Sequence, residues 1–523
     1  MKKRIVIGLS VLMAAVFIFA SACGRETAAP ASAPPSGGTE SGLPFVELDW
    51  YTGLGIPQDA QMVNDYLNEY LMEKINTKVN FIFMQSAEWR DRMAPLFASG
   101  QDLGVVAFGN QASVSFINQA KQGSYAPLED LLTEYAPGTK ALFSDAIWKA
   151  VTVDGHIYGV PSLKDNCYFI TTIYNKTMAE NLGIDMTKYP TFKNFDQPDY
   201  EALLYEVKEK RAEKYPEWND RPVLWPYNDV WPFHFAFETF ISQNYGVVCN
   251  IPGIMDVSGY DAYTIFNMYE TPEFLQYART RVKHVMDGIV AYDYDGKDDW
   301  WDDGSLFGWS NWGLVYAVPD LYSDLFDIEV IMPERIWTAT FNLQGAGVAV
   351  SSNNPNPERC AMVIEIMNTD PFFATTTRFG IEGQHYLRGD DGKMTFDGSP
   401  RNGDPANRGY HHWYGAPLGN LFIVEAPESY TGPDGIMYDL LNKYNREAII
   451  PNHMGFVFDT ENVLTEVAAL ASVIGEYQST IYDGILPSLE AVYTFVDEFN
   501  AKLKANGLDK VTDELVKQIA AWK

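Results

Sequence analysis

The chain has 523 residues, of which 46% are hydrophobic and 14% aromatic, and its formal net charge is −31 at pH 7. This apolar content excludes a mainly disordered chain, and the length predicts two or more domains. The negative charge repels phosphate backbones, so it argues against nucleic-acid binding and favours a neutral ligand over an anionic one.

The amino terminus has the pattern of a secretory signal peptide. Residues 1–22 begin with a Lys-Lys-Arg tripeptide, continue through an apolar run and end in two small residues. Cys23 follows within the letters FASAC, which resemble the lipobox of bacterial lipoproteins, although Ala20 stands where leucine is usual. Residues 23–43 are rich in Pro, Ser and Gly and predict a flexible tether. We therefore expect a lipid on Cys23 that anchors the protein on the extracellular face of the cell membrane.

The next part of the chain alternates strands and helices. Strands are predicted at residues 45–51, 79–84 and 105–108, and helices at residues 58–75 and 89–98. This alternation predicts a parallel sheet covered by helices.

Ligands of such sheets bind at the carboxyl ends of the strands, which makes Trp50 and Tyr51 candidate ligand-binding residues. Asn110, at the end of the segment LFASGQDLGVVAFGN, is a further candidate. A Gly-X-Gly sequence follows the first strand, but Gln58 stands where a dinucleotide-binding motif has its third glycine, so that interpretation is rejected.

Several segments together resemble a known family. They are DGHIYGVP at 154–161, a strand ending in Tyr-Asn-Lys at 168–176, FGIEGQHY at 379–386, GFVFDT at 455–460 and the last 37 residues. In this order they are similar to the family 1 extracellular solute-binding proteins of ATP-driven (ABC) importers, and the last three to its LipO-like lipoprotein subgroup. LFASGQDLGVVAFGN also resembles a family segment, with Gly104 in place of the usual aspartate.

The resemblance implies an α/β, periplasmic-binding-protein-like fold of type II, in which two hinge-linked lobes close on a ligand between them. It places one lobe at residues 44–166 plus 344–449 and the other at 167–343 plus 450–523. It also implies a monomer that catalyses no reaction and delivers its ligand to ABC permease subunits.

Tryptophan is concentrated in the middle of the chain, where eight of the 13 residues lie between 218 and 337. Indole rings stack on the apolar faces of sugar rings, so this density favours a carbohydrate ligand, although core packing explains any single tryptophan equally well. The candidates in a proline-bounded loop are Trp225, Tyr227 and Trp231, and those beside a helix predicted at 314–325 are Trp309 and Trp312.

Other candidates follow from their position in the chain. Trp337 precedes a stretch that resembles the second crossing between the lobes, and Lys164 and Asp165 precede the first. His412 and Trp413 lie in a glycine-rich region expected near the ligand.

No cofactor is expected. The acidic stretch 293–304 could bind calcium, but it lacks the glycine position and the closing glutamate of an EF-hand, and a solvated loop explains it better. Cys167, Cys249 and Cys360 allow one disulfide, and their spacing shows no zinc motif.

The sequence therefore predicts a lipoprotein that captures a carbohydrate, most simply an oligosaccharide, for an ABC importer. Two alternatives stay open. One is a secreted glycoside hydrolase, whose paired carboxylates cannot be recognised among 69 acidic residues. The other is a ligand-sensing surface lipoprotein. No H-E-x-x-H, Walker A or G-x-S-x-G motif supports catalysis.

Overall fold

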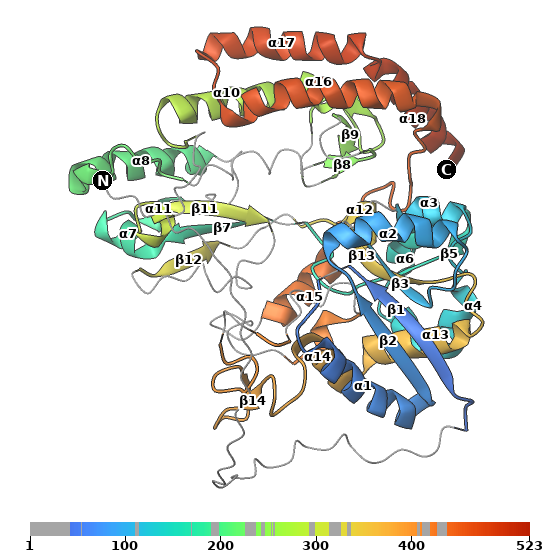
Figure 1. Ribbon diagram of the computed structural model, residues 1–523. Coiled ribbons are helices and arrows are strands. Elements are labelled where there is room, and N and C mark those ends of the chain that lie inside the picture. Colours follow the sequence, from blue (N-terminus) through green and yellow to red (C-terminus); the bar gives the residue numbers. More distant parts are fainter. Residues whose placement is uncertain are drawn as a thin grey trace, which may run out of the picture.

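The computed structural model describes residues 42–522 with short gaps, and Figure 1 shows the elements arranged in two lobes. The gaps are residues 54, 110–114, 169, 190–197, 225–236, 242–245, 253, 255–256, 292–298, 313–325, 332–335, 405–407, 411–418 and 426–436. The predicted signal peptide, Cys23 and most of the tether lie outside the described residues. No helix in the described part of the chain is both long and apolar enough to cross a bilayer.

The first lobe is built on a five-stranded sheet of order β2-β1-β3-β13-β6. Its strands are β1 (Val46–Thr52), β2 (Thr77–Phe83), β3 (Val105–Gly109), β6 (Val160–Pro161) and β13 (Ala346–Val350). β1 pairs in parallel with β2 and β3, whereas β13 runs antiparallel to both β3 and β6. The prediction of a parallel sheet is therefore correct for the first three strands and wrong for the whole sheet. β13 enters after the chain has passed through the other lobe, so no crossover helix fixes its direction.

Most of the helices that cover this sheet form one core with it, whereas the helix of residues 86–98 packs on it in a second, smaller cluster. The helices are α1 (Ala60–Ile75), α2 (Ser86–Ala98), α3 (Phe116–Lys121), α4 (Glu129–Tyr135), α5 (Pro137–Ala141), α6 (Asp145–Trp148), α13 (Pro357–Thr369) and α14 (Pro371–Phe379). Two hairpins, β4 (Thr152–Val153) with β5 (His156–Ile157) and β14 (Leu387–Arg388) with β15 (Met394–Thr395), complete the lobe. The predicted helices 58–75 and 89–98 are confirmed as α1 and α2.

The second lobe contains two three-stranded sheets. One consists of β7 (Ile170–Asn175), β11 (Gly308–Trp312) and β12 (Ile328–Ile331), and the other of β8 (Phe237–Thr239), β9 (Val247–Asn250) and β10 (Phe266–Asn267). The longer helices are α8 (Pro198–Lys214), α10 (Pro272–Met286), α16 (Leu464–Asp483), α17 (Leu489–Ala505) and α18 (Leu508–Trp522). The shorter ones are α7 (Lys176–Asn181) and α11 (Asp299–Asp302). Two further short helices adjoin the first lobe: α12 (Thr340–Gln344) directly precedes β13, and α15 (Met437–Glu447) precedes the return of the chain to the second lobe.

The last helices form the outer layer of the second lobe (Figure 1). In α18 the predicted apolar face is confirmed for Val511, Leu515 and Ile519, which are buried in the core shared with α10, α16 and α17. Trp522, expected on the same face, is 44% exposed, and its ring meets Phe456 of this core at a centroid distance of 5.7 Å. Trp522 therefore lies at the edge of the predicted face.

The FGIEGQHY segment at 379–386 contacts the start of α1 through His385 and Asp59. The backbone N–H of Ile381 donates to His385 Nδ1 (3.0 Å), so the proton of the neutral ring is on Nε2, which lies 3.3 Å from Asp59 Oδ2. Arg401 pairs with the other oxygen of Asp59 at 2.7 Å. His385 is fully buried, so the neutral imidazole is part of the structure of this lobe.

This arrangement predicts a pH-dependent stability. Burial lowers the pKa of His385 below its ordinary value, although Asp59 acts in the opposite direction. The unfolded chain therefore takes up a proton more readily, and the free energy of unfolding should fall as the pH drops below about 6.5. We expect the free energy of unfolding, measured with urea at about pH 7.5 and pH 5.5, to fall less between these pH values in His385→Gln than in the wild type.

His156→Gln, at an exposed position of the same lobe, is the matched histidine-to-glutamine control. Equal pH dependence in His385→Gln and the wild type would contradict the role of the buried ring.

Candidate functional site

Three stretches of chain connect the two lobes and lie side by side. The first joins β6 to β7, the second joins β12 to β13, and the third joins α15 to α16. The backbone N–H of Tyr168 donates to the carbonyl of Trp337 (2.5 Å), and the N–H of Trp337 donates back to Tyr168 (3.2 Å). Thr338 donates to Ile449 (3.0 Å). We call this group of three hydrogen-bonded stretches the crossing region.

The first stretch turns at residues 164–166, and the side-chain amides of Asn166, which is buried, and Asn445, which is half-buried, hold this turn in place. The N–H of Asn166 donates to Asn445 Oδ1 (3.0 Å), and the side-chain amide of Asn445 donates to the carbonyl of Lys164. Asn166 Nδ2 in turn donates to the carbonyl of Ser162 (2.9 Å). Thr338 Oγ1 donates to the carbonyl of Asn166 at 2.5 Å, which brings in the second stretch. Side chains therefore reinforce the backbone pairing at the point where the chain changes lobes.

Lys164 and Asp165 project polar groups from this turn. Lys164 Nζ lies 2.5 Å from Asp165 Oδ1, and the two side chains are 24% and 26% exposed. Such a partly exposed pair contributes little to stability, but its remaining donors and acceptors suit the hydroxyl groups of a ligand. Contact with a ligand remains a prediction for both residues.

Trp337 also lies in the crossing region, but its indole is only 5% exposed. The ring packs on Tyr168 at a centroid distance of 5.4 Å, and Tyr168 packs on Phe341 at 5.2 Å. This aromatic packing accounts for the burial of Trp337 without a ligand, so its predicted contact with a ligand remains a prediction.

Trp50 and Tyr51 are at the end of β1, as predicted, and both are buried. The indole of Trp50 is 1% exposed and lies 5.6 Å from the ring of Phe81 within the core. Tyr51 belongs to a small cluster with Met84 and other residues, and burial, assisted by the nearby Asp49, raises the pKa of its hydroxyl. Core packing is the role that the structure gives these two side chains, and ligand contact stays a prediction.

The remaining candidates are placed only in part. Trp309 and Trp312 lie on β11, where their backbones pair with Ile173 and Ile170 of β7; the helix expected at 314–325 is outside the described residues. The candidates that lie outside the described residues altogether are Asn110, Trp225, Tyr227, Trp231, His412 and Trp413. Of all the candidates, the structure brings together Lys164, Asp165 and Trp337 in the crossing region.

Comparison with known proteins identifies the architecture. The chain is 24% identical over 467 residues, 86% of each protein, to a carbohydrate ABC transporter substrate-binding protein of Streptococcus pneumoniae serotype 4. Its structure matches the N-glycan transport solute-binding protein NgtS of S. pneumoniae with a TM-score of 0.72 at 22% identity, over 91% of this chain and 98% of NgtS. The chain has the two-lobe fold of the solute-binding proteins. The two-lobe α/β fold that the family resemblance implied is thereby confirmed.

Two further comparisons add detail. The HMO-binding, ABC-transporter-associated solute-binding protein of Bifidobacterium longum infantis matches with a TM-score of 0.59 at 15% identity, over 91% of this chain and 99% of that one. Residues 452–523 match a family described as a domain of unknown function, DUF3502. This last match begins within the third stretch of the crossing region, three residues after Ile449, and covers the helical end of the second lobe (Figure 1).

Sequence reasoning missed the amides that fasten the crossing region. Asn166 and Asn445 are separated by 279 residues, and neither has a motif of its own. The three cysteines of the described chain are buried and no disulfide joins any two of them, so the disulfide that they allowed is not formed. Of the acidic stretch, residues 293–298 lie outside the described residues, and Asp303 is paired with Arg221.

The burial of Trp337 predicts a large effect on stability. Trp337→Ala should lower the free energy of unfolding by about 3–5 kcal/mol, because it removes a large buried ring from the crossing region. Trp337→Phe should lower it less, and Trp522→Ala, at an exposed position, should have little effect. Urea denaturation measures all three variants. A Trp337→Ala variant as stable as the wild type would contradict the packing described here.

Proposed function

We propose that this protein captures a neutral oligosaccharide between its two lobes and delivers it to the permease of an ABC importer. The observation that carries the proposal is the crossing region, in which three stretches of chain join two separately packed lobes. A joint of this kind permits the lobes to rotate while their cores stay intact. The relatives named above are substrate-binding proteins of transporters, which supports binding and not catalysis.

The proposed mechanism is ligand-stabilised closure. Open and closed arrangements exchange, and a ligand that contacts both lobes only in the closed one shifts the population towards it. The comparison with NgtS supports such a change of shape, because the TM-score of 0.72 falls to 0.63 and 0.59 for the complexes of NgtS with Man1GlcNAc and Man5GlcNAc. On this account the lobes comprise residues 44–166 plus 344–449 and residues 167–343 plus 450–523.

Within this proposal, Lys164 and Asp165 bind ligand hydroxyls from the crossing region. The net charge of −31 disfavours anionic sugars, so a neutral glycan is the proposed class. Signal cleavage and lipidation at Cys23 would hold the protein, as a monomer, on the extracellular face of the membrane, where the tether lets it reach the permease.

Ligand screening tests the proposal directly. The purified protein should gain thermal stability with a neutral oligosaccharide such as Man5GlcNAc, by about 2.7 kcal/mol at a ligand concentration of 100 times the Kd. A charged uronate oligosaccharide should give no shift. Chromatography of the mixture should recover the saccharide intact. Recovery of shortened products would show an enzyme instead, and stabilisation by peptides alone would contradict the carbohydrate.

The crossing region provides a second test. Asp165→Asn should lower the affinity for the oligosaccharide about tenfold, which corresponds to about 1.4 kcal/mol. The reason is that the amide replaces one hydrogen-bond acceptor of the carboxylate by a donor. Asp154→Asn, at an exposed turn, is the matched control and should bind as the wild type does. Calorimetric titration measures both. Equal affinity for all three proteins would remove Asp165 from the site.

A further inference from the structure

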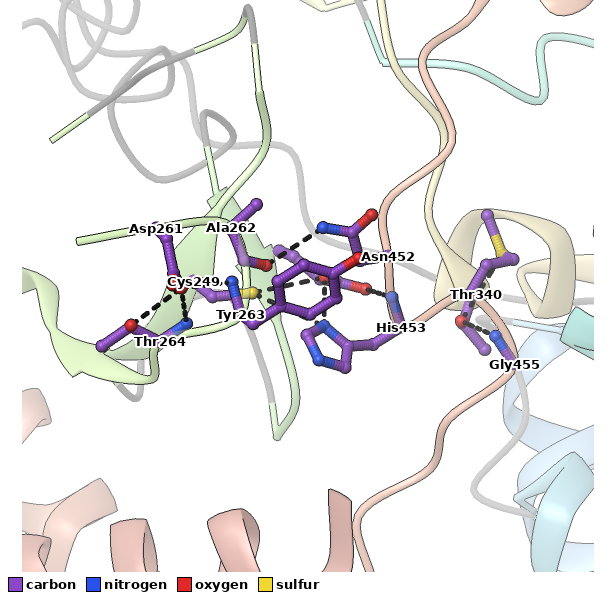
Figure 2. Close-up of polar contacts among 11 residues, drawn as sticks. Cys249, Asp261, Ala262, Tyr263, Thr264, Thr340, Asn452, His453 and Gly455 are labelled. Atoms are coloured by element: carbon purple, nitrogen blue, oxygen red, sulfur yellow. Dashed lines mark hydrogen bonds and ion pairs between the residues drawn. The ribbon is translucent and has the colours of Figure 1, made fainter. Parts of the chain in front are cut away.

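Three potential metal ligands meet in the interior of the second lobe. Glu238 on β8 and Cys249 on β9 stand directly opposite each other in an antiparallel pair. His453 joins them from the third stretch of the crossing region, and Figure 2 shows its imidazole beside Cys249. One donor atom from each lies within 4.8 Å of the other two, and all three residues are buried. No fourth His, Cys, Asp or Glu of the described chain joins this group.

The spacing of the donor atoms resembles that of ligands around one ion. His453 Nδ1 is 2.9 Å from Glu238 Oε2, and Cys249 Sγ is 3.3 Å from the same oxygen and 3.7 Å from the same nitrogen. Zinc bonds of about 2.0–2.3 Å in tetrahedral directions separate neighbouring ligands by roughly 3.3–3.7 Å. A small adjustment of the side chains would therefore seat a zinc ion among them.

The surroundings hold the ligands in position. The backbone N–H of His453 donates to Glu238 Oε1 (3.2 Å), which leaves Oε2 to face the other two donors. The rings of Phe240 and Tyr263 meet the imidazole edge-on, with interplanar angles of 76° and 81°. The hydrogen bond orients the carboxylate, and the two rings form an apolar shell that limits access of water to the group.

The chemistry of the group fits a divalent ion better than a catalytic triad. A thiolate and a carboxylate carry two negative charges, which one Zn²⁺ neutralises in a buried site, and a sulfur, nitrogen and oxygen set is one that zinc accepts. In a nucleophilic triad the acid and the nucleophile contact different imidazole nitrogens. Here both Glu238 and Cys249 face Nδ1.

We propose that Glu238, Cys249 and His453 form a zinc site. The site would join the paired strands β8 and β9 to His453 on the third stretch of the crossing region. His453 lies four residues after Ile449, whose backbone pairs with the second stretch. Zinc would therefore stabilise the second lobe where its helical end begins. This proposal does not depend on the identity of the transported ligand.

Zinc content and cobalt spectroscopy test the site. After treatment with a chelator, incubation with excess ZnCl₂ and gel filtration, the purified protein should retain one zinc ion per chain by mass spectrometry. Co²⁺ in place of zinc should give the intense near-ultraviolet band of a thiolate ligand. Cys249→Ser should lose this band and the retained zinc, and ZnCl₂ should raise the Tm of the wild type but not of this variant.

Cys360→Ser is the matched control, because Cys360 is also buried and outside any disulfide and lies in the first lobe. It should bind zinc as the wild type does. If Cys249→Ser does not fold, Glu238→Gln decides the question, since it removes a charged ligand with little change of shape and should reduce the zinc retained. Absence of zinc and of the cobalt band in the wild type, or zinc binding equal to the wild type in a folded Cys249→Ser or Glu238→Gln variant, would overturn the proposal.

Discussion

The backbone pairing of Tyr168, Trp337 and Ile449 is the constraint on which the arrangement of the molecule depends. Three stretches from distant parts of the sequence meet there, and each stretch leads from one lobe to the other. Asn166, Asn445 and Thr338 add side-chain bonds to the same place. Because the lobes have separate cores, their relative position depends on this narrow set of contacts more than on a shared interior.

The same constraint organises the two proposals. Lys164 and Asp165 project from the turn of the first stretch, where a ligand held between the lobes would meet them. His453 lies on the third stretch and meets Glu238 and Cys249 inside the second lobe. The proposed ligand site and the proposed metal site would thus both adjoin one hydrogen-bonded region. The first depends on movement of the lobes, and the second depends on the rigidity of one lobe.

Local periodicity was enough to predict the first strands and helices, because the apolar residues of α1 and the strand residues of β1 repeat at the spacing of their elements. Pairing between distant segments was not predictable in this way. The antiparallel direction of β13, the crossing-region amides, and a group that joins Cys249 to His453 across 204 residues leave no local signal. Residue type also failed to separate roles: Trp50 and Trp337 are suited to stack on a sugar, yet their rings are packed in the interior.

Small-angle X-ray scattering of the purified protein with and without a bound neutral oligosaccharide tests the central claim most directly. Closure of the lobes about the crossing region predicts a smaller radius of gyration in the saturated complex, with the second lobe's zinc content unchanged. An unchanged radius of gyration at full saturation would contradict capture by closure and would place the ligand on one lobe alone.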